Sequence, residues 1–206
     1  MEKYLAETRI IDWNHPAIRE LAATLAEGRA SGADVTGSCF EWVRDNIKHS
    51  YDYKLNPVTC KASDVLLYGT GYCYAKSHLL GALLRANGIP AGFCYQRLSL
   101  AREDAPYCLH GLNAVYLPEH GWYRMDARGN KDGVHAQFTP PTEQLAFQLN
   151  SRLEADLPEI WPAPLDCVVS VLEKCQTYME VYQNLPDVTL INDTQTSSKI
   201  VIHECN

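Results

Sequence analysis

The sequence predicts an α+β fold in which helices come first and an antiparallel sheet follows. Three segments with helical periodicity lie between residues 16 and 87, and three strand-like segments rich in aromatic and β-branched residues lie between residues 91 and 127. Strands that follow one another without intervening helices argue against a doubly wound parallel sheet. The chain has 206 residues, 46% of them hydrophobic, which suits one domain with a sizeable core.

The predicted helices begin and end at recognisable signals. Their expected spans are about 16–27, 35–48 and 73–87. Pro16 takes the first helical position of the first helix, and Asp34 or Thr36 can cap the second. Thr70 can cap the third helix, which starts close to Cys73 and ends at an Asn-Gly pair.

The predicted strands are separated by turn residues, whereas the C-terminal third has a weaker pattern. The expected strands are about 91–100, 109–117 and 121–127, with PEHG (118–121) as the hairpin turn between the last two. Elsewhere we expect an irregular segment at 49–61, a short turn or helix at 62–71, a strand near 145–149, one amphipathic helix over 165–182 and a strand at 199–202. We expect a single domain over residues 1–206, in which a C-terminal extension from about 137 packs on a core of about 15–136.

The charge pattern argues against several classes of partner. The net charge is −7, and no dense run of Lys and Arg appears, so we expect no nucleic-acid partner and no docking on anionic membranes. No apolar run approaches the ~20 residues that a membrane helix needs. The first residues, MEKYLAETRIIDW, are charged and lack the apolar stretch of a signal peptide, which predicts a cytoplasmic protein. The sequence leaves the oligomeric state open.

Eight cysteines are spread along the chain without a C-x-x-C pair. Their positions are 39, 60, 73, 94, 108, 167, 175 and 205. This spacing argues against a zinc knuckle or a thioredoxin-type redox site, and the chain is unlike a small disulfide scaffold. We expect most of these cysteines to be buried, reduced thiols.

Cys73 is the cysteine whose position suggests chemistry. At a helix start, unpaired backbone N–H groups converge and the helix dipole is positive, which favours a thiolate and can hold a developing oxyanion. Gly69 and Gly71 allow a sharp turn before it and leave room for a substrate. A buried structural cysteine is the alternative interpretation.

A nucleophilic thiolate needs a histidine and a group that orients that histidine. His110 opens a predicted strand 37 residues after Cys73 (110 − 73), and Gly111 beside it offers space. The other histidines are less suited: loops or a terminus are expected for His15, His49, His120, His135 and His203, and His78 is expected to face away from the thiol.

Asp126 is the natural third member, 16 residues after His110 (126 − 110). A hairpin loop with an odd number of residues puts the two side chains on one face of the sheet. A turn centred on Pro118 sets them opposite each other, whereas a loop of residues 119–121 offsets them by about four residues, roughly 13 Å. Asp126 can also be a solvated carboxylate at a strand end.

Three separated motifs, GYCYAKSHLLGALLRANGIPAG, HGLNAVYL and GWYRMDARG, resemble the core of the transglutaminase-like superfamily of papain-like cysteine enzymes. FEWVRDNIKHSYDY and ASDVLLYGTGYC resemble the segments that precede the nucleophile there, so the likeness covers about residues 35–130. The resemblance implies a nucleophile helix packed on an antiparallel sheet. It also implies that Cys73 is the nucleophile, His110 the general base and acid, and Asp126 the residue that orients the histidine.

The sequence departs from the family pattern near the histidine and the aspartate. Leu112 and Ala114 stand where relatives often have an aromatic and an acidic residue, and Ala127 stands where proline is common. These changes put the acceptor side and the substrate cleft in doubt. Tyr51 is the candidate for the side chain that completes the oxyanion hole, with Tyr72 and Gly71 also in the cleft; a rim or core tyrosine is the alternative for Tyr51.

The expected function is cysteine-dependent acyl transfer on a peptide or amide substrate through a thioester, with hydrolysis favoured. The alternatives are transglutaminase-type transfer to an amine, a catalytically silent peptide-binding module with the same fold, and a zinc site of Cys73, Cys94 or Cys108 with His110. No metal or other cofactor is expected. Two acidic clusters, Glu103-Asp104 and 154–159, can rim a cleft for basic substrates or form solvated faces.

Overall fold

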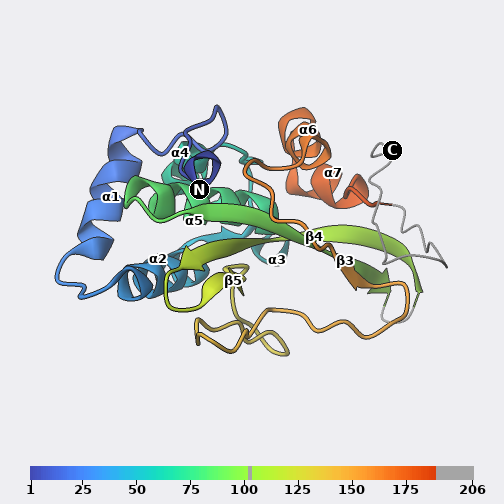
Figure 1. The fold of residues 1–206 in the computed structure, drawn as a ribbon. Coiled ribbons are helices and arrows are strands. Elements are labelled where there is room, and N and C mark those ends of the chain that lie inside the picture. The colour runs from blue at the N-terminus through green and yellow to red at the C-terminus, as the bar shows by residue number, and fades with distance from the viewer. Residues whose placement is uncertain (102–103, 189–206) are drawn as a thin grey trace.

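Helices cover one face of an antiparallel sheet, and a long irregular segment covers the other (Figure 1). The computed structural model describes residues 1–101 and 104–188. The helices are α1 (Pro16–Ala26), α2 (Gly32–Asn46), α3 (Ser50–Tyr53), α4 (Ala62–Tyr68), α5 (Cys73–Ala86), α6 (Asp166–Lys174) and α7 (Tyr178–Gln183), after a 3-10 turn η1 (Glu2–Tyr4). The strands are β1 (Lys48–His49), β2 (Thr70–Gly71), β3 (Ala91–Ala101), β4 (Asp104–Leu117), β5 (Gly121–Met125) and β6 (Ala155–Asp156).

The main sheet has the order β5-β4-β3-β6, and all its neighbouring strands are antiparallel. Short β1 and β2 pair in parallel outside this sheet. Helices that precede an antiparallel sheet are the arrangement that the sequence predicts, so the α+β class is confirmed.

The sheet separates two apolar cores, because side chains alternate between its faces. The face toward α5 carries the larger core, whose strand residues include Phe93, Tyr95, Leu109, Val115 and Leu117. The other face carries a smaller core beneath the irregular segment, which contains Cys94, Leu112, Ala114 and Leu145. The residues at positions 112 and 114 that depart from the family pattern therefore pack in this smaller core.

The helix ends follow from local chemistry, with two corrections to the expected caps. α2 starts three residues earlier than predicted, because the Ser31 hydroxyl accepts a hydrogen bond from Asp34 N at 3.1 Å and is the cap in place of Asp34 or Thr36. The prediction that Thr70 caps α5 is wrong as well. The Thr70 hydroxyl bonds Lys48 O at 3.0 Å, and Tyr72 is the cap residue without a side-chain hydrogen bond.

Two further predictions are corrected after residue 140. The segment 145–149 forms no strand, and only an isolated bridge joins Gln137 to Gln144. The helix predicted over 165–182 is two helices, because α6 ends at Lys174 and the Thr177 hydroxyl caps α7 by accepting from Glu180 N at 3.2 Å. The strand predicted at 199–202 lies outside the described residues.

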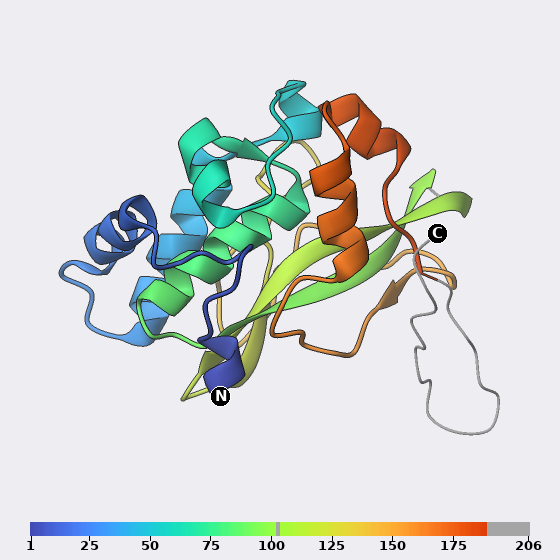
Figure 2. The ribbon, with the colours of Figure 1, turned by 90° about the horizontal axis from the view of Figure 1, so that it is seen from above.

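The last two helices, α6 and α7, are held beside the start of α5 by hydrogen bonds of Tyr178 in α7. Figure 2 shows α6 and α7 on the same side of the sheet as α5. The Tyr72 hydroxyl donates to Tyr178 O at 2.6 Å, and Tyr178 N donates to Asn56 Oδ1 at 2.8 Å. The predicted irregular segment 49–61, which includes α3, thus contacts α7. None of the described helices combines the length and apolar character needed to cross a bilayer.

Candidate functional site

Cys73 is the first residue of α5, directly after β2. No side chain caps this helix, so the N–H groups of its first turn are left for another partner at the positive end of the helix dipole. Gly71 permits this close sequence of strand and helix, because a Cβ there would lie 2.9 Å from Ala75 Cβ and 3.1 Å from Thr59 Oγ1. The missing side chain of Gly71 makes room for the protein's own packing, not for substrate as the sequence suggested.

The Cys73 thiol contacts the sheet where β4 extends beyond the end of its neighbour β5. β5 ends at Met125, opposite Asn113, so the next outward-facing N–H groups of β4 have no strand to bond. Gly111 N donates to Cys73 Sγ at 3.5 Å, and Leu109 N donates to Pro186 O at 2.7 Å. The edge of β4 is therefore completed by the thiol and by the C-terminal segment.

Gly111 is required for this approach. A Cβ at this position would lie 2.8 Å from Tyr74 Cδ1 and 3.3 Å from Tyr74 Cα, inside the first turn of α5. The space that the sequence suggested beside His110 is thus filled by α5 itself.

The structure brings His110 and Asp126 together. His110 Nε2 donates to Asp126 Oδ2 at 2.7 Å, and both side chains are buried. The carboxylate also accepts from Arg128 N at 3.0 Å through Oδ1 and from Ala146 N at 3.2 Å through Oδ2. Burial alone would raise the pKa of Asp126, but the neighbouring His110 and these hydrogen bonds lower it, so the carboxylate is ionised at neutral pH.

The hairpin register lies between the two that the sequence left open. Leu117 pairs with Gly121 around a three-residue loop, 118–120, so residue 126 falls level with 112, two positions from His110. Diagonal neighbours of this kind lie about 7–8 Å apart, which longer side chains can bridge. The odd loop length puts both side chains on one face, and no bulge is needed between them.

His110 also contacts the Cys73 thiol. Its Nε2 is occupied by Asp126, so the remaining ring nitrogen, Nδ1, is the one that can hydrogen-bond the Cys73 thiol. Burial alone would lower the pKa of His110, but the charge of Asp126 and the contact with Cys73 raise it to about 10. An imidazolium is the state expected beside a thiolate at neutral pH.

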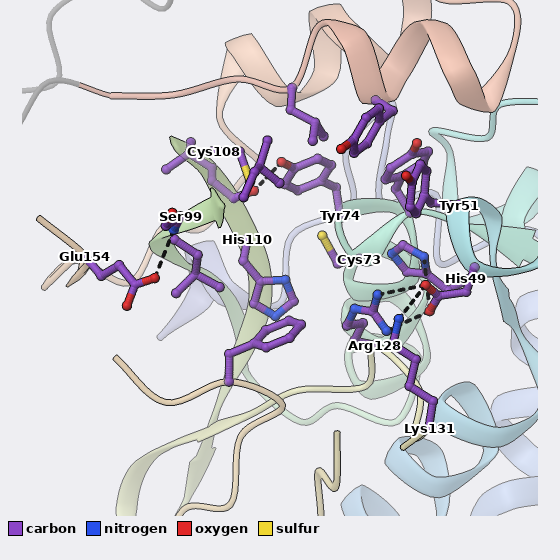
Figure 3. Close-up of a pocket in the computed structure, with 18 of the residues that line it drawn as sticks. His49, Tyr51, Cys73, Tyr74, Ser99, Cys108, His110, Arg128, Lys131 and Glu154 are labelled. Atoms are coloured by element: carbon purple, nitrogen blue, oxygen red, sulfur yellow. Dashed lines mark hydrogen bonds and ion pairs between the residues drawn. The ribbon is translucent and has the colours of Figure 1, made fainter. Parts of the chain in front are cut away.

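A cavity of about 430 Å³ opens at the thiol (Figure 3). Its middle is apolar, with walls that include Leu98, Leu100, Leu109, Phe147 and Leu185. One end carries His49, Asp52, Arg128 and Lys131, and the other carries Ser99 and Glu154. The Phe147 ring lies edge-on to His110 at 5.0 Å between centroids. The cavity is therefore a cleft with an apolar centre and two polar ends.

Two predicted cleft residues line this cavity, but each side chain is engaged by a residue of α7. Tyr51 is at the rim, 36% exposed, and its ring stacks on Tyr182 at 4.4 Å. Tyr72 is buried and donates its hydroxyl to Tyr178 O. The Glu154 carboxylate accepts from the backbone N–H groups of Ser99 and of residues 150 and 151, which satisfies it within the protein. The other predicted acidic cluster, at 103–104, is not among the side chains described.

His49 is the site residue that sequence reasoning missed. β1 pairs with β2 so that His49 lies opposite Gly71, two residues before Cys73. Figure 3 shows Cys73 between the rings of His110 and His49. This placement depends on a parallel pairing between segments 22 residues apart (70 − 48), and no local signal in the sequence reveals it.

The environment of His49 keeps it neutral. Burial and the nearby charge of Arg128 lower its pKa well below the ordinary value, against the opposing effect of Asp52. Its Nδ1 is buried without a hydrogen-bond partner among the described residues, and Asp52 Oδ2 lies 3.7 Å away. A neutral imidazole beside the thiol can donate one N–H to a substrate oxygen.

The remaining cysteines do not build a second centre in the part of the chain that the structure describes. Besides Cys73, the buried free thiols are Cys39, Cys60, Cys94 and Cys108. Cys94 lies in the small core, and Cys108 lines the cleft. Within residues 1–101 and 104–188, no three His, Cys, Asp or Glu side chains are grouped as a metal site, so the zinc alternative finds no ligand set there.

The sequence profile of the transglutaminase-like superfamily matches residues 19–127, more than half of the chain. The chain therefore belongs to the transglutaminase-like superfamily, as the resemblance of its motifs implied. Membership supports a cysteine-enzyme kind of function. Comparison with the curated proteins gives no match.

Solved structures with a similar fold are more distant. They include a provisionally assigned cysteine protease from Cytophaga hutchinsonii, with 20% identity and a TM-score of 0.48 over 61% of this chain and 40% of its own. The periplasmic domain of TgpA from Pseudomonas aeruginosa has 22% identity and a TM-score of 0.45 over 60% of this chain and 45% of its own. The chain thus spans less than half the length of either protein.

Proposed function

We propose that the protein catalyses cysteine-dependent acyl transfer on a peptide or amide substrate, with water as the acceptor. The observation that carries the proposal is the order of contacts in one cleft: the thiol at a helix start, His110 between it and a buried carboxylate, and an adjoining cavity for substrate. The arrangement matches the roles of nucleophile, general acid-base and orienting group. A cytoplasmic location stays part of this proposal.

Acylation starts from the thiolate and the imidazolium. Cys73 Sγ attacks the carbonyl carbon, a carbon–sulfur bond forms, and the carbonyl oxygen becomes an oxyanion. When the intermediate collapses, the carbon–nitrogen bond breaks and the proton on His110 Nδ1 passes to the leaving amine. The products of this half are a thioester on Cys73, a free amine and a neutral His110.

Deacylation restores both groups. His110 takes a proton from water as the hydroxyl oxygen adds to the thioester carbon, and the carbon–sulfur bond then breaks. A carboxylic acid leaves, Cys73 returns as the thiolate, and the proton stays on His110. Asp126 orients the ring and stabilises its positive charge throughout.

Two groups support the proposal as donors to the oxyanion. The backbone N–H of Cys73 is uncapped by any side chain, and His49 lies beside the thiol with no hydrogen-bond partner for its buried Nδ1. We assign the side-chain donor to His49, because the Tyr51 ring is held at the rim by Tyr182. Preorganised donors of this kind stabilise the transition state more than the substrate.

Hydrolysis is favoured over transfer to an amine by the charge beside the cleft. A second cavity, of about 380 Å³, adjoins the first and is lined by five basic and two acidic side chains. A protonated amine acceptor would be repelled there, whereas water carries no charge. The silent binding module is disfavoured because such a module has no need of a buried His110–Asp126 pair in contact with a thiol.

The test is the rate at which iodoacetamide alkylates Cys73 as a function of pH, with the site identified by peptide mapping. Fast reaction is expected at pH 6, where less than ~1% of an ordinary thiol is ionised. His110→Ala should slow the reaction about 10²-fold at this pH, because the imidazolium that stabilises the thiolate is lost. His120→Ala, in the exposed hairpin loop, is the matched control and should not alter the rate.

The outcome that contradicts the proposal is ordinary thiol reactivity of Cys73 in both the parent and His110→Ala. Given a reactive thiolate, a library of amides and peptides separates the substrate classes: released ammonia identifies a deamidase, and released peptide identifies a protease. Incorporation of an added amine in place of hydrolysis would show amine transfer.

A further inference from the structure

One wall between the two cavities carries an unusual concentration of charge. His49, Asp52, Arg128 and Lys131 line both the cleft at Cys73 and the second cavity. The second cavity adds Arg44, Lys48 and Lys76 with only Asp45 in opposition. The chain as a whole has a net charge of −7, so this region has the opposite sign to the molecule.

Asp52 does not neutralise the wall. Arg128 binds its carboxylate with both terminal nitrogens, at 2.8 and 3.2 Å, and Lys131 Nζ lies 2.7 Å from Oδ1. One negative charge is thus shared by two positive charges, and the cluster of Asp52, Arg128 and Lys131 has a surplus of one positive charge. We call this cluster the basic wall.

Arg128 and Lys131 of the basic wall have N–H donors that Asp52 does not use. A lysine has three N–H donors and an arginine five, of which Asp52 takes one and two respectively. The Lys131 side chain is 46% exposed, so its remaining donors reach the cleft, and Arg128 lies against the Phe147 ring that flanks His110. These free donors all suit an acceptor with negative charge.

Two other basic side chains of the second cavity, Arg44 and Lys76, bind partners within the protein and do not reach the cleft. Arg44 pairs with Asp45 at 2.7 Å, and Lys76 is buried and donates to Arg44 O at 3.2 Å and to Ile47 O. The charge of Arg44 is balanced by Asp45, and burial lowers the pKa of Lys76 to about 7, so neither adds a full positive charge beside the wall or contacts a ligand in the cleft. Arg128 and Lys131 are the residues placed to make that contact.

We propose that the basic wall binds a carboxylate of the substrate, so that the protein acts on amides whose acyl or amine part carries a negative charge. This inference rests on the proposed function. A single carboxylate matches the surplus of one positive charge, whereas a phosphate dianion would leave uncompensated negative charge in the cleft. The apolar middle of the cleft then holds the uncharged part of the same substrate.

Two alkylating agents test this proposal because they differ mainly in charge. Iodoacetate carries a carboxylate and iodoacetamide does not. In both, the same thiolate attacks the CH₂ carbon and displaces iodide. The readout is the ratio of their second-order rate constants at Cys73, iodoacetate over iodoacetamide, at about 0.15 M salt, where distant surface charge is screened beyond about 8 Å. We expect the ratio in the parent to exceed that of glutathione.

The decisive variants change one charge of the wall. Lys131→Gln should lower the ratio about fivefold, the effect of one charge several ångströms away in a partly solvated cleft. Asp52→Asn should raise the ratio, because it frees Arg128 and Lys131. Lys3→Gln, an exposed lysine outside both cavities, is the matched control for loss of one positive charge and should leave the ratio unchanged.

The proposal is overturned if the parent ratio does not exceed that of glutathione, or if Lys131→Gln lowers it no more than Lys3→Gln does. Arg128→Gln breaks a nearly buried ion pair, so the exposed Lys131 carries the test if that variant does not fold. The parent and Lys131→Gln share the same nucleophile and the same His110, so the effect of His110 on the ratio cancels between them and a change in the ratio reports on the wall. Slow iodoacetamide reaction would count against the proposed function, whereas an unchanged ratio would count against the basic wall alone.

Discussion

At the scale of single residues, Asp126 shows how much one side chain can organise. Its two carboxylate oxygens bind the His110 ring, the backbone of Arg128 and the backbone of Ala146, all within 3.2 Å. The first contact sets the tautomer and the charge of the histidine, and the other two fix the carboxylate. In the proposed reaction, Asp126 is therefore a positioning residue that acts through His110.

Asp126→Asn should remove the reactivity of Cys73 at low pH without unfolding the protein. The neutral amide cannot hold the pKa of His110 near 10, so the imidazolium and the thiolate beside it are no longer favoured near neutral pH. We expect iodoacetamide alkylation at pH 6 to fall about 10²-fold and to recover as pH rises. Glu143→Gln, which disturbs a surface pair with Arg124, is the control. A pH profile identical to that of the parent would refute the role given to Asp126.

At the scale of elements, the position of the site is set by the point at which β5 ends. Had β5 continued beyond Met125, it would occupy the edge of β4 that Cys73 and Pro186 now complete. The N-terminus of α5 can reach this edge only because Gly111 has no side chain. The contact between one helix start and one bare strand edge thus decides where the thiol lies.

Gly111→Ala tests that contact. A Cβ at 2.8 Å from Tyr74 Cδ1 must push the first turn of α5 away from β4, which should cost about 1–3 kcal/mol of unfolding free energy and slow alkylation of Cys73. Urea unfolding and the iodoacetamide rate measure the two effects. Gly32→Ala is the matched control, because a Cβ at that glycine in α2 has no neighbour within 4 Å. Equal stability of the two variants would mean that α5 does not depend on the missing side chain.

Whether a feature of the fold or site could be predicted depends on how far apart in the sequence its interacting residues lie. The periodicities of α1 and α5, the proline at the start of α1, the Asn-Gly pair at the end of α5 and the parity of His110 and Asp126 are local properties, and sequence reasoning identified them. The break between α6 and α7 also had a local signal, Thr177 followed three residues later by Glu180, which the continuous apolar stripe obscured.

Other features depend on contacts between distant segments. Ala146 lies where a strand was expected, yet its N–H bonds Asp126 instead of a neighbouring strand. His49 reaches the site through the pairing of β1 with β2, and the basic wall joins residue 52 to residues 128 and 131. Such contacts leave no periodic trace in the sequence, so the pattern could not indicate them.

At the scale of the whole molecule, three basic side chains are buried in conditions that disfavour their charge. His78 is fully buried with Nδ1 on Cys60 O at 2.7 Å, and burial lowers its pKa to about 4. Burial and the charge of Arg128 likewise lower the pKa of His49, and that of Lys76 to about 7. His110 has the opposite effect, because its raised pKa contributes stability that is lost as pH rises from 6.5 to about 10. The net expectation is a folded protein that loses stability as pH falls below about 6.5, where His49 and His78 of the unfolded chain bind protons.

His78 gives this expectation a measurable size. Between pH 4 and 6.5 the unfolded chain binds a proton at His78 that the folded protein does not, so the stability is present above pH 6.5 and is lost as pH falls. The loss amounts to about 3 kcal/mol over this interval, at about 1.4 kcal/mol per pH unit.

His78→Gln removes the side chain that binds a proton in the unfolded chain but not in the folded protein. The free energy of unfolding of this variant, from urea curves at several pH values, should depend less steeply on pH by about one proton over the same interval. His15→Gln, at the exposed start of α1, is the control and should keep the parent slope. The same slope in the parent and in His78→Gln would show that His78 is protonated in the folded protein.

The hydrogen bond from Ala146 to Asp126 also has a consequence for the order of events during synthesis. Cys73 leaves the ribosome 73 residues before Ala146 does (146 − 73), and Leu185, which closes the cleft, follows later still. A nascent chain therefore carries its thiol without an anchored carboxylate and without a finished cleft. We therefore expect the reactivity proposed for Cys73 to appear only when the last segments have docked.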